Sequence, residues 1–230
     1  MYYLKKSLLM KKTTIIMIAL FAFNSLLIKA QTNKGKVLIG ASSNIGLAGS
    51  GSDLMSIGFS SVKEKNDVNG VIDSETQRST NINLIPKVGY FLADNFAVGL
   101  DLNLGFSSNS SEDSDVKFTQ TIVSAGPFAR YYIPGTTVLP FLEVNGAIGR
   151  INNKIDFGGN NNPEDNISNL TTFGGGAGIA APLGEKVTLD VSVGYYSTTI
   201  KDKEDNPNND RTVIGTLGLK FGFTVFLGSN

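Results

Sequence analysis

Six charged residues in this sequence, set apart from its polar loops, have the types and positions that could do chemistry. Each stands in a stretch where apolar and small residues alternate, on the side of the small residues. Three are basic and three are acidic, and they are Lys87, Asp101, Arg130, Glu143, Asp190 and Lys220. Carboxylates in such a setting can exchange protons, and a layer of ionisable groups can pass ions. The possibilities are acid–base catalysis, ion passage and a purely structural salt-bridge layer.

The residue types that the chain lacks exclude much other chemistry. There is no cysteine and no histidine, so disulfides, thiolate zinc sites, Ser-His-Asp triads and His-ligated metals are excluded. The glycine-rich residues 174–178 precede no predicted helix and do not form a phosphate-binding loop. The acidic clusters at 112–115 and 202–210 match no EF-hand spacing, which favours solvated loops over calcium sites. We therefore expect no enzyme and no cofactor.

The elements that position the six charges are predicted to be strands. Apolar residues alternate with small or polar ones, with the period of two that a strand with two different faces produces. The alternation is clearest in residues 96–106, 187–195 and 213–227, and it is weaker in residues 81–92, 120–133, 138–151 and 171–183. No stretch after residue 31 has the apolar spacing of an amphipathic helix. The sequence predicts an all-β fold.

The connections between these strands alternate strictly in length. Residues 93–95, 134–136 and 184–185 are tight turns, whereas residues 64–79, 107–117, 152–169 and 201–210 are long and polar. This alternation predicts an eight-stranded antiparallel up-and-down transmembrane β-barrel, with short periplasmic turns and long extracellular loops. Residues 36–62 are too long for a single crossing, and we expect one crossing at residues 37–47.

The face pattern indicates lipid outside the barrel. A soluble barrel places its large apolar residues inside and charged residues outside. Here the second face consists mostly of Gly, Ala, Ser, Thr and Asn, which suit a crowded lumen. Aromatic residues near the periplasmic strand ends are expected to form an interface girdle, and they are Tyr90, Phe91, Phe96, Tyr131, Tyr132 and Phe226.

The barrel model gives the six charges a common level close to the bilayer midplane. Lys87 and Asp101 flank one tight turn, and Arg130 and Glu143 flank another, so hairpin pairing should bring each pair close. An eight-stranded barrel has just enough room for side chains. We expect a salt-bridge layer that fills the lumen, and an ion or proton path is the alternative.

The first 30 residues are predicted to be a signal peptide. They contain five lysines, four of them before an apolar stretch at residues 15–23, no acidic residue, and a small residue, Ala30, at their end. This pattern predicts cleavage before Gln31. A membrane anchor helix is the alternative, but it needs about 20 apolar residues. Residues 31–230 would then form the barrel domain.

Three segments carry a resemblance to a known family. "PKVGYFLADNFAVGLDLNLGFSS", "GPFARYYIPG" and "LPFLEVNGAIG" are similar to segments of the small outer-membrane β-barrel domain of Gram-negative bacteria, which shares the architecture of the OmpA and OmpX barrels. The resemblance implies location in the outer membrane, surrounded by lipid and lipopolysaccharide, and insertion by the barrel assembly machinery. The balanced charge argues against a nucleic-acid partner.

Two functions follow as hypotheses. The first is a structural or surface-interaction protein whose acidic loops contact surfaces, lipopolysaccharide or partner proteins, with no particular surface partner indicated. The second is a narrow channel for ions or small solutes.

Overall fold

The computed structural model describes residues 32–48, 58–68, 71–111, 116–134, 137–158, 164–203 and 210–228. The predicted signal peptide at residues 1–30 lies outside these ranges. The strands are β1 (Val37–Ala48), β2 (Gly58–Val68), β3 (Val71–Ala93), β4 (Phe96–Ser111), β5 (Lys117–Tyr132), β6 (Leu139–Asp156), β7 (Glu164–Pro182), β8 (Val187–Asp202) and β9 (Thr212–Leu227). Among the described residues, no helix is long and apolar enough to cross a membrane.

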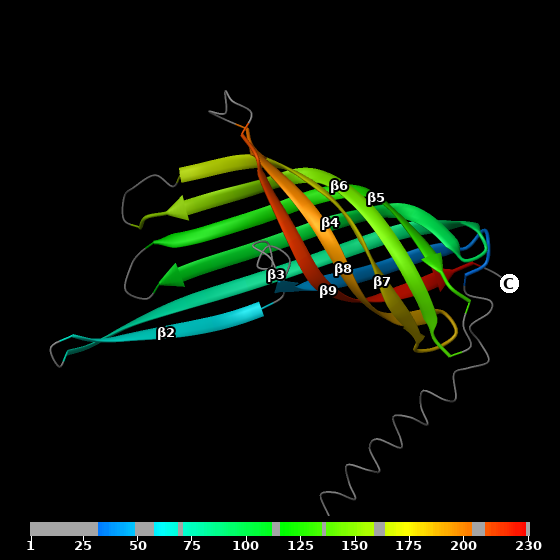
Figure 1. Ribbon diagram of the computed structural model, residues 1–230, viewed down its shortest axis with the longest axis horizontal. Helices are drawn as coiled ribbons and strands as arrows, with labels where there is room; N and C mark the ends of the chain where they lie inside the picture. Colours follow the sequence, from blue (N-terminus) through cyan, green and yellow to red (C-terminus); the bar gives the residue numbers. More distant parts are fainter. Residues whose placement is uncertain are drawn as a thin grey trace, which may run out of the picture.

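The strands close into an antiparallel barrel (Figure 1). Neighbours in the chain pair from β3 through to β9, and β1 completes the wall by pairing with both β9 and β3. Strand β3 pairs with β1 from Ile85 to Tyr90 and then with β2 from Val71 to Asn81. Strands β1 and β2 therefore occupy one position in the wall. The prediction of eight antiparallel strands, with a single first crossing, is confirmed.

The predicted long loops were wrong in their extent. Residues 64–79 were expected to be a loop, but they belong to a hairpin whose ladder runs from Gly58 opposite Asn81 to Val68 opposite Val71. Strands β4 to β8 likewise continue into the segments expected to be loops. A crossing needs only about 9–11 residues, whereas β3 has 23. Alternating apolar residues mark only the lipid-facing part of a strand, and polar residues beyond it still pair through their backbones.

The side chains divide between the two faces as the alternation predicts. Large apolar residues on the outer face are exposed, including Leu100 at 60%, Phe173 at 70% and Ile148 at 73%. On the inner face of β9, Thr216, Lys220 and Thr224 are buried. The lumen is therefore polar in its middle part, and the apolar band faces outward, as lipid requires.

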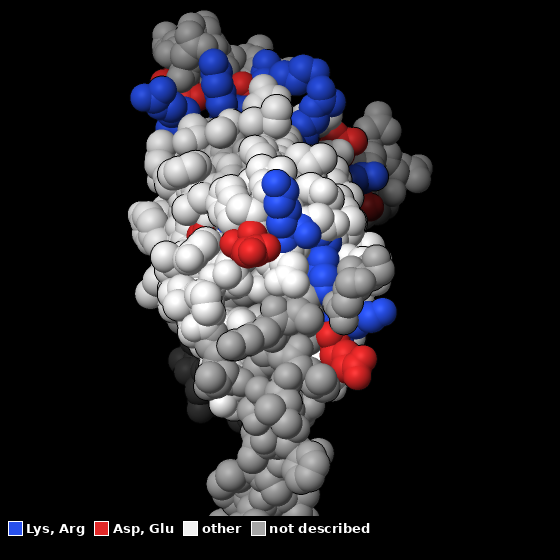
Figure 2. Space-filling model, turned by 90° about the vertical axis from the view of Figure 1, so that its right-hand side faces the viewer, with Lys and Arg blue, Asp and Glu red and all other residues white. Residues whose placement is uncertain are grey.

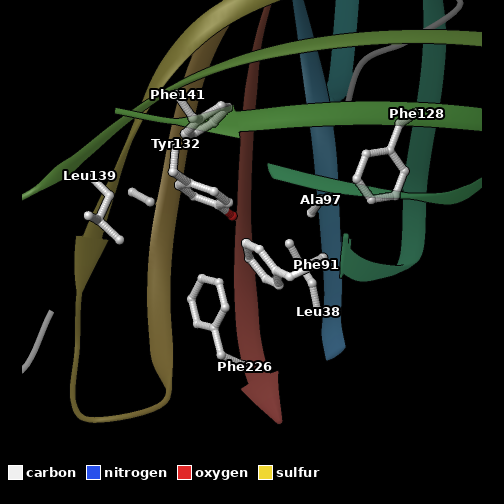
Figure 3. Close-up of a cluster of buried hydrophobic side chains, with 9 residues drawn as sticks. Leu38, Phe91, Ala97, Phe128, Tyr132, Leu139, Phe141 and Phe226 are labelled. Carbon is white, nitrogen blue, oxygen red and sulfur yellow. The ribbon is translucent and has the colours of Figure 1, made fainter. Parts of the chain in front are cut away.

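A cluster of aromatic side chains fills the end of the lumen where the short turns lie (Figure 3). Phe91, Tyr132, Phe141 and Phe226 are each at most 2% exposed, and the ring centroids of their four contacting pairs are 5.8–6.0 Å apart. Leu38 and Leu139 pack against them. We call these six residues the aromatic plug.

The plug corrects the expected aromatic girdle. Tyr90, Tyr131 and Phe96 do face outward, with exposures of 46%, 45% and 37%. Phe91 and Tyr132, in contrast, point into the lumen, and so does Phe226. The reason is strand geometry, because adjacent residues in a strand point to opposite faces. A girdle could include only one residue of each adjacent aromatic pair.

The segment before β1 is tied to the β3–β4 turn beside the plug. The Gly35 N–H donates to the Phe91 carbonyl at 2.9 Å, and the Asn95 N–H donates to the Thr32 carbonyl at 2.7 Å. The Thr32 hydroxyl donates to Asn95 Oδ1 at 2.6 Å. Asn95 has a φ of 65°, which asparagine tolerates better than most residues. These bonds attach the segment that precedes β1 to the end of the barrel where the short turns lie.

The alternation of short and long connections predicts how the barrel is oriented. We expect the turn end to face the periplasm and the extended strands to lie outside the cell. Cysteine at the exposed position Ser110 should then react with an impermeant thiol reagent on intact cells. Cysteine at the exposed turn position Asp94 should react only after the cells are opened. The opposite labelling pattern would contradict this orientation.

Candidate functional site

The structure brings all six inward charges together in one layer directly above the aromatic plug. Each of the six is at most 7% exposed. The backbone register places Lys87 opposite Asp101 and Arg130 opposite Glu143, which are the two pairs that the hairpin turns predict. Asp190 and Lys220, for which the sequence suggested no partner, enter the same layer from β8 and β9. Six strands therefore contribute to the charge layer.

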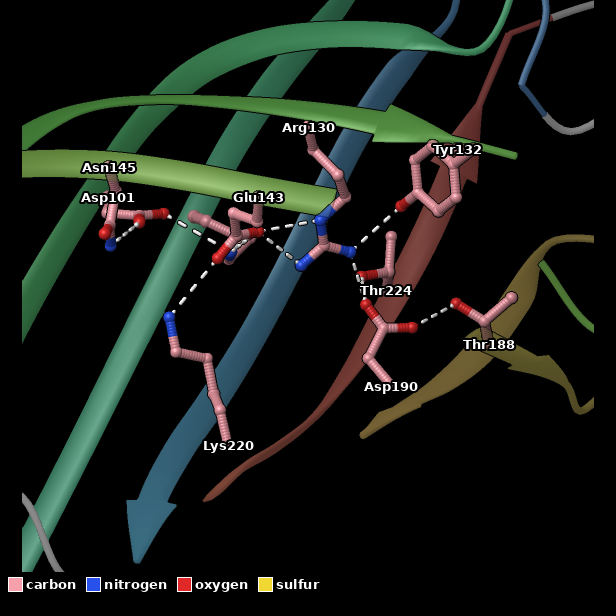
Figure 4. A network of polar contacts seen from close by, with 10 residues as sticks. Asp101, Arg130, Tyr132, Glu143, Asn145, Thr188, Asp190, Lys220 and Thr224 are labelled. Atoms are coloured by element: carbon pink, nitrogen blue, oxygen red, sulfur yellow. Dashed lines mark hydrogen bonds and ion pairs between the residues drawn. The ribbon is translucent and has the colours of Figure 1, made fainter. Parts of the chain in front are cut away.

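Glu143 is the centre of this layer (Figure 4). Its Oε2 accepts hydrogen bonds from Lys87 Nζ at 2.8 Å and from Arg130 Nε at 2.7 Å, and Arg130 Nη2 lies 2.6 Å away. Its Oε1 accepts from Lys220 Nζ at 3.3 Å. All three cations of the layer thus converge on one carboxylate, which the pairing of neighbouring strands did not predict.

Asp190 anchors the other side of Arg130. Arg130 Nη1 donates to Asp190 Oδ2, and it also donates to the Tyr132 hydroxyl at 3.0 Å. The hydroxyls of Thr188 and Thr224 donate to Asp190 at 2.7 and 2.8 Å. The sequence analysis considered only charged residues and so did not identify the two threonines. The available signal was that both have the same inward parity as the charges. Thr188 lies two residues before Asp190 in β8, and Thr224 lies opposite Thr188 in β9.

Asp101 has the weakest contacts of the three carboxylates. Lys87 Nζ lies 3.6 Å from Asp101 Oδ1, and Asn145 Nδ2 donates to Oδ2 at 3.3 Å. The expected Lys87–Asp101 pair is therefore looser than the contact of Lys87 with Glu143. Strand register aligns the backbones of Lys87 and Asp101, but the long lysine side chain reaches across the lumen to the better acceptor.

Aromatic rings lie next to each cation of the layer. Arg130 stacks on Phe141, with its guanidinium carbon 4.1 Å from the ring centroid. Lys87 Nζ lies 4.7 Å from the centroid of Phe128, and Lys220 Nζ lies 5.1 Å from that of Tyr196. Such cation–π contacts are stronger where water is excluded. Of these rings only Phe141 belongs to the plug, so the Arg130–Phe141 contact connects the charge layer to the plug below it.

Two glycines make room for these rings. A Cβ atom at Gly99 would lie 2.0 Å from the Val88 carbonyl oxygen and 2.6 Å from Phe128 Cε1. One at Gly178 would lie 2.6 Å from both Phe141 Cζ and the Val191 carbonyl oxygen. Real Cβ atoms do not approach other atoms so closely, so a larger residue at either position would clash with the ring and with the neighbouring strand. The inner face of β7 consists of small residues, which the sequence analysis associates with a narrow lumen. These small residues leave room for the plug residue Phe141.

The arrangement suits a structural role better than a chemical one. Every charge in the layer contacts at least one opposite charge. The cavity in the layer, lined by Lys87, Arg130, Asp190 and Lys220, has a volume of only about 10 Å³. Within the part of the chain that the structure describes, no group of three or more acidic residues is arranged to hold a metal ion. The side chains of the layer are therefore closely packed against one another.

Comparison with known sequences identifies the family. The sequence model described as "Outer membrane protein beta-barrel domain" matches residues 16–223. The chain belongs to this outer-membrane β-barrel family. It is therefore a barrel protein of the outer membrane, and its exposed apolar band faces the lipid of that membrane. No curated protein matches the chain by sequence.

Solved barrels of similar fold are distant in sequence. Neisserial surface protein A has 18% identity and a TM-score of 0.41, over 83% of this chain and 95% of that chain. A major outer membrane protein of Thermus thermophilus has 13% identity and a TM-score of 0.46, over 84% and 99%. The outer membrane enzyme PagL has 12% identity and a TM-score of 0.33, over 81% and 97%. All three are at most 18% identical to this chain.

The convergence on Glu143 makes it the most sensitive residue of the layer. Glu143→Gln keeps the side-chain shape but leaves three buried cations without their common counter-ion. We expect it to lower the free energy of unfolding by about 3–5 kcal/mol, as breaking a buried ion pair does. Asp101→Asn should cost clearly less, because its contacts are longer. Urea unfolding in lipid vesicles measures both effects.

The exposed Glu164 provides a matched control. Glu164→Gln should change the free energy of unfolding by no more than about 0.5 kcal/mol. If Glu143→Gln cost no more than this control, the lumen would be solvated and the salt-bridge interpretation would be wrong.

Proposed function

We propose that the protein is a non-conducting barrel that holds its extended strands and loops at the cell surface for contact with lipopolysaccharide and with partner molecules. The observation that carries this proposal is the filled lumen. The inward residues of β6 belong to three packed levels of the lumen. Leu139 and Phe141 are in the plug, Glu143 is in the charge layer, and Ile151 is in an aliphatic cluster with Ile122 and Leu170. Solutes would have to displace packed side chains at each of these levels.

The proposed role does not include catalysis. The chain has no histidine or cysteine, and the buried carboxylates Glu143 and Asp190 are held by cations and hydroxyl groups. A catalytic acid or base must be able to reach a substrate. The small cavity in the charge layer supports a structural assignment for these groups.

Export and assembly belong to the same proposal. Residues 1–30 would be removed as a signal peptide, and the barrel assembly machinery would insert residues 31–230. The ties between Thr32, Gly35 and the β3–β4 turn support a mature domain that begins close to Gln31, because the chain is already bound to the barrel from Thr32 onward.

Lipopolysaccharide is the lipid partner that we propose for the outer surface of β6 to β9. Arg150 lies opposite Asn169, and Asn169 lies opposite Lys201, so a row of polar side chains crosses three strands. Arg211, exposed directly before β9, adds a third cation next to the last pair of the β8–β9 ladder, Ile200 opposite Thr212. Lys and Arg side chains gather at the upper end of Figure 2, where β8 ends and β9 begins in Figure 1.

The height of this row supports the choice of partner. The outward residues Ile148 and Val213, each two positions from a cation of the row, are 73% and 60% exposed and belong to the apolar band. Cations immediately beyond such a band lie at the level of lipid headgroups. The phosphates of lipopolysaccharide offer Arg150 and Arg211 an anionic partner at that level.

The filled lumen predicts that the purified protein conducts no ions. In planar bilayers the wild-type barrel should show no steady open levels. Arg130→Ser with Phe141→Ala removes a stacked pair from the charge layer and the plug, and it should produce stepwise conductance. Heat-modifiable gel mobility shows whether this variant is folded. Steady open levels of the wild type would favour the alternative function, a narrow channel through the ionisable layer.

The row of cations predicts preferential binding of phosphate-bearing lipid. Arg150→Gln with Arg211→Gln should weaken the binding of lipopolysaccharide by roughly 2 kcal/mol, at about 1 kcal/mol for each cation near the membrane surface. Titration of lipopolysaccharide into protein in neutral nanodiscs measures the loss. Lys34→Gln, an exposed lysine near the turn end, is the matched control and should change nothing. Equal effects of both variants would argue against a specific lipid site.

A further inference from the structure

A second cavity lies in the lumen above the charge layer, and we call it the chamber. It has a volume of about 30 Å³, three times that of the cavity in the charge layer. Asp101 and Lys220 from the charge layer line it, together with Ser124, Asn145, Ala147 and Tyr196. On β5 and β6 the lumen becomes aliphatic again beyond the chamber, at Ile122 and Ile151. The chamber is thus a polar space between two packed levels.

The polar atoms left without a partner around the chamber are oxygens. Asp101 Oδ1, Ser124 Oγ and Asn145 Oδ1 are fully buried and have no hydrogen-bond partner in the structure. The 3.6 Å between Lys87 Nζ and Asp101 Oδ1 is too long for a hydrogen bond. The nitrogen of the Asn145 amide is already used, because it donates to the other oxygen of Asp101. Asp101 Oδ1 and Asn145 Oδ1 can only accept, and the Ser124 hydroxyl can both accept and donate, so the chamber suits a ligand that donates hydrogen bonds.

The size and charge of the chamber decide which donor fits. A water molecule needs a cavity of roughly 10–15 Å³ by this measure, so the chamber has room for about two. A metal cation would also satisfy oxygen acceptors. However, the charge layer already balances three cations against three carboxylates, and the ammonium group of Lys220 reaches the same space. An added positive charge would be buried without a counter-ion, which is costly.

We propose that the chamber is a binding site for a small cluster of ordered water molecules. The waters donate to Asp101 Oδ1, Asn145 Oδ1 and Ser124 Oγ, and they connect Asp101 to Lys220. Asp101, which has only long contacts within the protein, thereby becomes a full member of the network through water. The charge layer then depends on water that enters when the barrel folds.

Filling the chamber with an apolar side chain tests this proposal, because a hydrated chamber and a dry chamber predict opposite changes in stability. Ala147→Val adds two methyl groups at the chamber wall. If water is bound there, the variant displaces it and leaves buried acceptors without a donor, so the unfolding equilibrium constant in urea should rise at least tenfold. If the chamber is dry, the same variant fills an empty space and stabilises the barrel. Ala129→Val, the same change on the outer face of β5, is the matched control.

A second variant tests the same point with little change in volume. Ser124→Ala removes one hydroxyl, which can both accept and donate. In a dry chamber it should stabilise the protein, because an unsatisfied buried hydroxyl is lost, whereas in a hydrated chamber it should be neutral or destabilising. Stabilisation by Ser124→Ala relative to the wild type, stabilisation by Ala147→Val relative to Ala129→Val, or no difference between these two valine variants would overturn the proposal.

Two measurements on the wild-type protein complete the test. Unfolding midpoints in sodium, potassium and choline chloride at equal ionic strength should coincide, and stabilisation by one metal ion would replace water with a cation as the ligand. NMR in nanodiscs should show cross-peaks between water and the side-chain amide protons of Asn145. The absence of these cross-peaks would also overturn the proposal, and this measurement does not depend on whether a variant folds.

Discussion

The hydrocarbon of a membrane offers no hydrogen-bond partners, and the rest of this structure depends on that constraint. A sheet in lipid must close so that its backbone groups bond to one another. Here closure occurs where β1 pairs with β9 on one side and with β3 on the other. Closing only eight strand positions gives a narrow lumen. Gly178 is a consequence of that narrowness, because a Cβ atom there would lie only 2.6 Å from the Phe141 ring.

The same narrowness explains why the charges converge rather than form isolated pairs. Side chains from opposite walls meet at the axis, so Lys87 from β3, Arg130 from β5 and Lys220 from β9 all reach Glu143 of β6. The contacts of the two lysines join strands that are not neighbours in the wall. The ladders hold the barrel around its circumference, and the charge layer together with the aromatic plug connects it across its diameter.

The sequence predicted those features that depend on strand parity. Alternation indicated which face meets lipid, the even number of strands and the inward position of all six charges, and turn length indicated the register of Lys87 with Asp101. Parity was not applied to Tyr90-Phe91 and Tyr131-Tyr132, and so the plug was missed. The partners across the lumen were not predictable, because the curvature of the wall determines which long side chains meet. The polar ends of the strands were missed because alternation of apolar residues stops where lipid stops.

Strand β3 shows what such an extension means for the cell surface. About ten of its 23 residues suffice to cross the membrane, and residues 71–80 continue outward in a ladder with β2. At roughly 3.3 Å per residue, these ten residues span about 33 Å along the strand. A flexible loop of equal length would fold back on itself, whereas a hydrogen-bonded ribbon keeps its length. The height at which its tip meets the surroundings is thus determined by the number of paired residues, and evolution can adjust that height in steps of one pair.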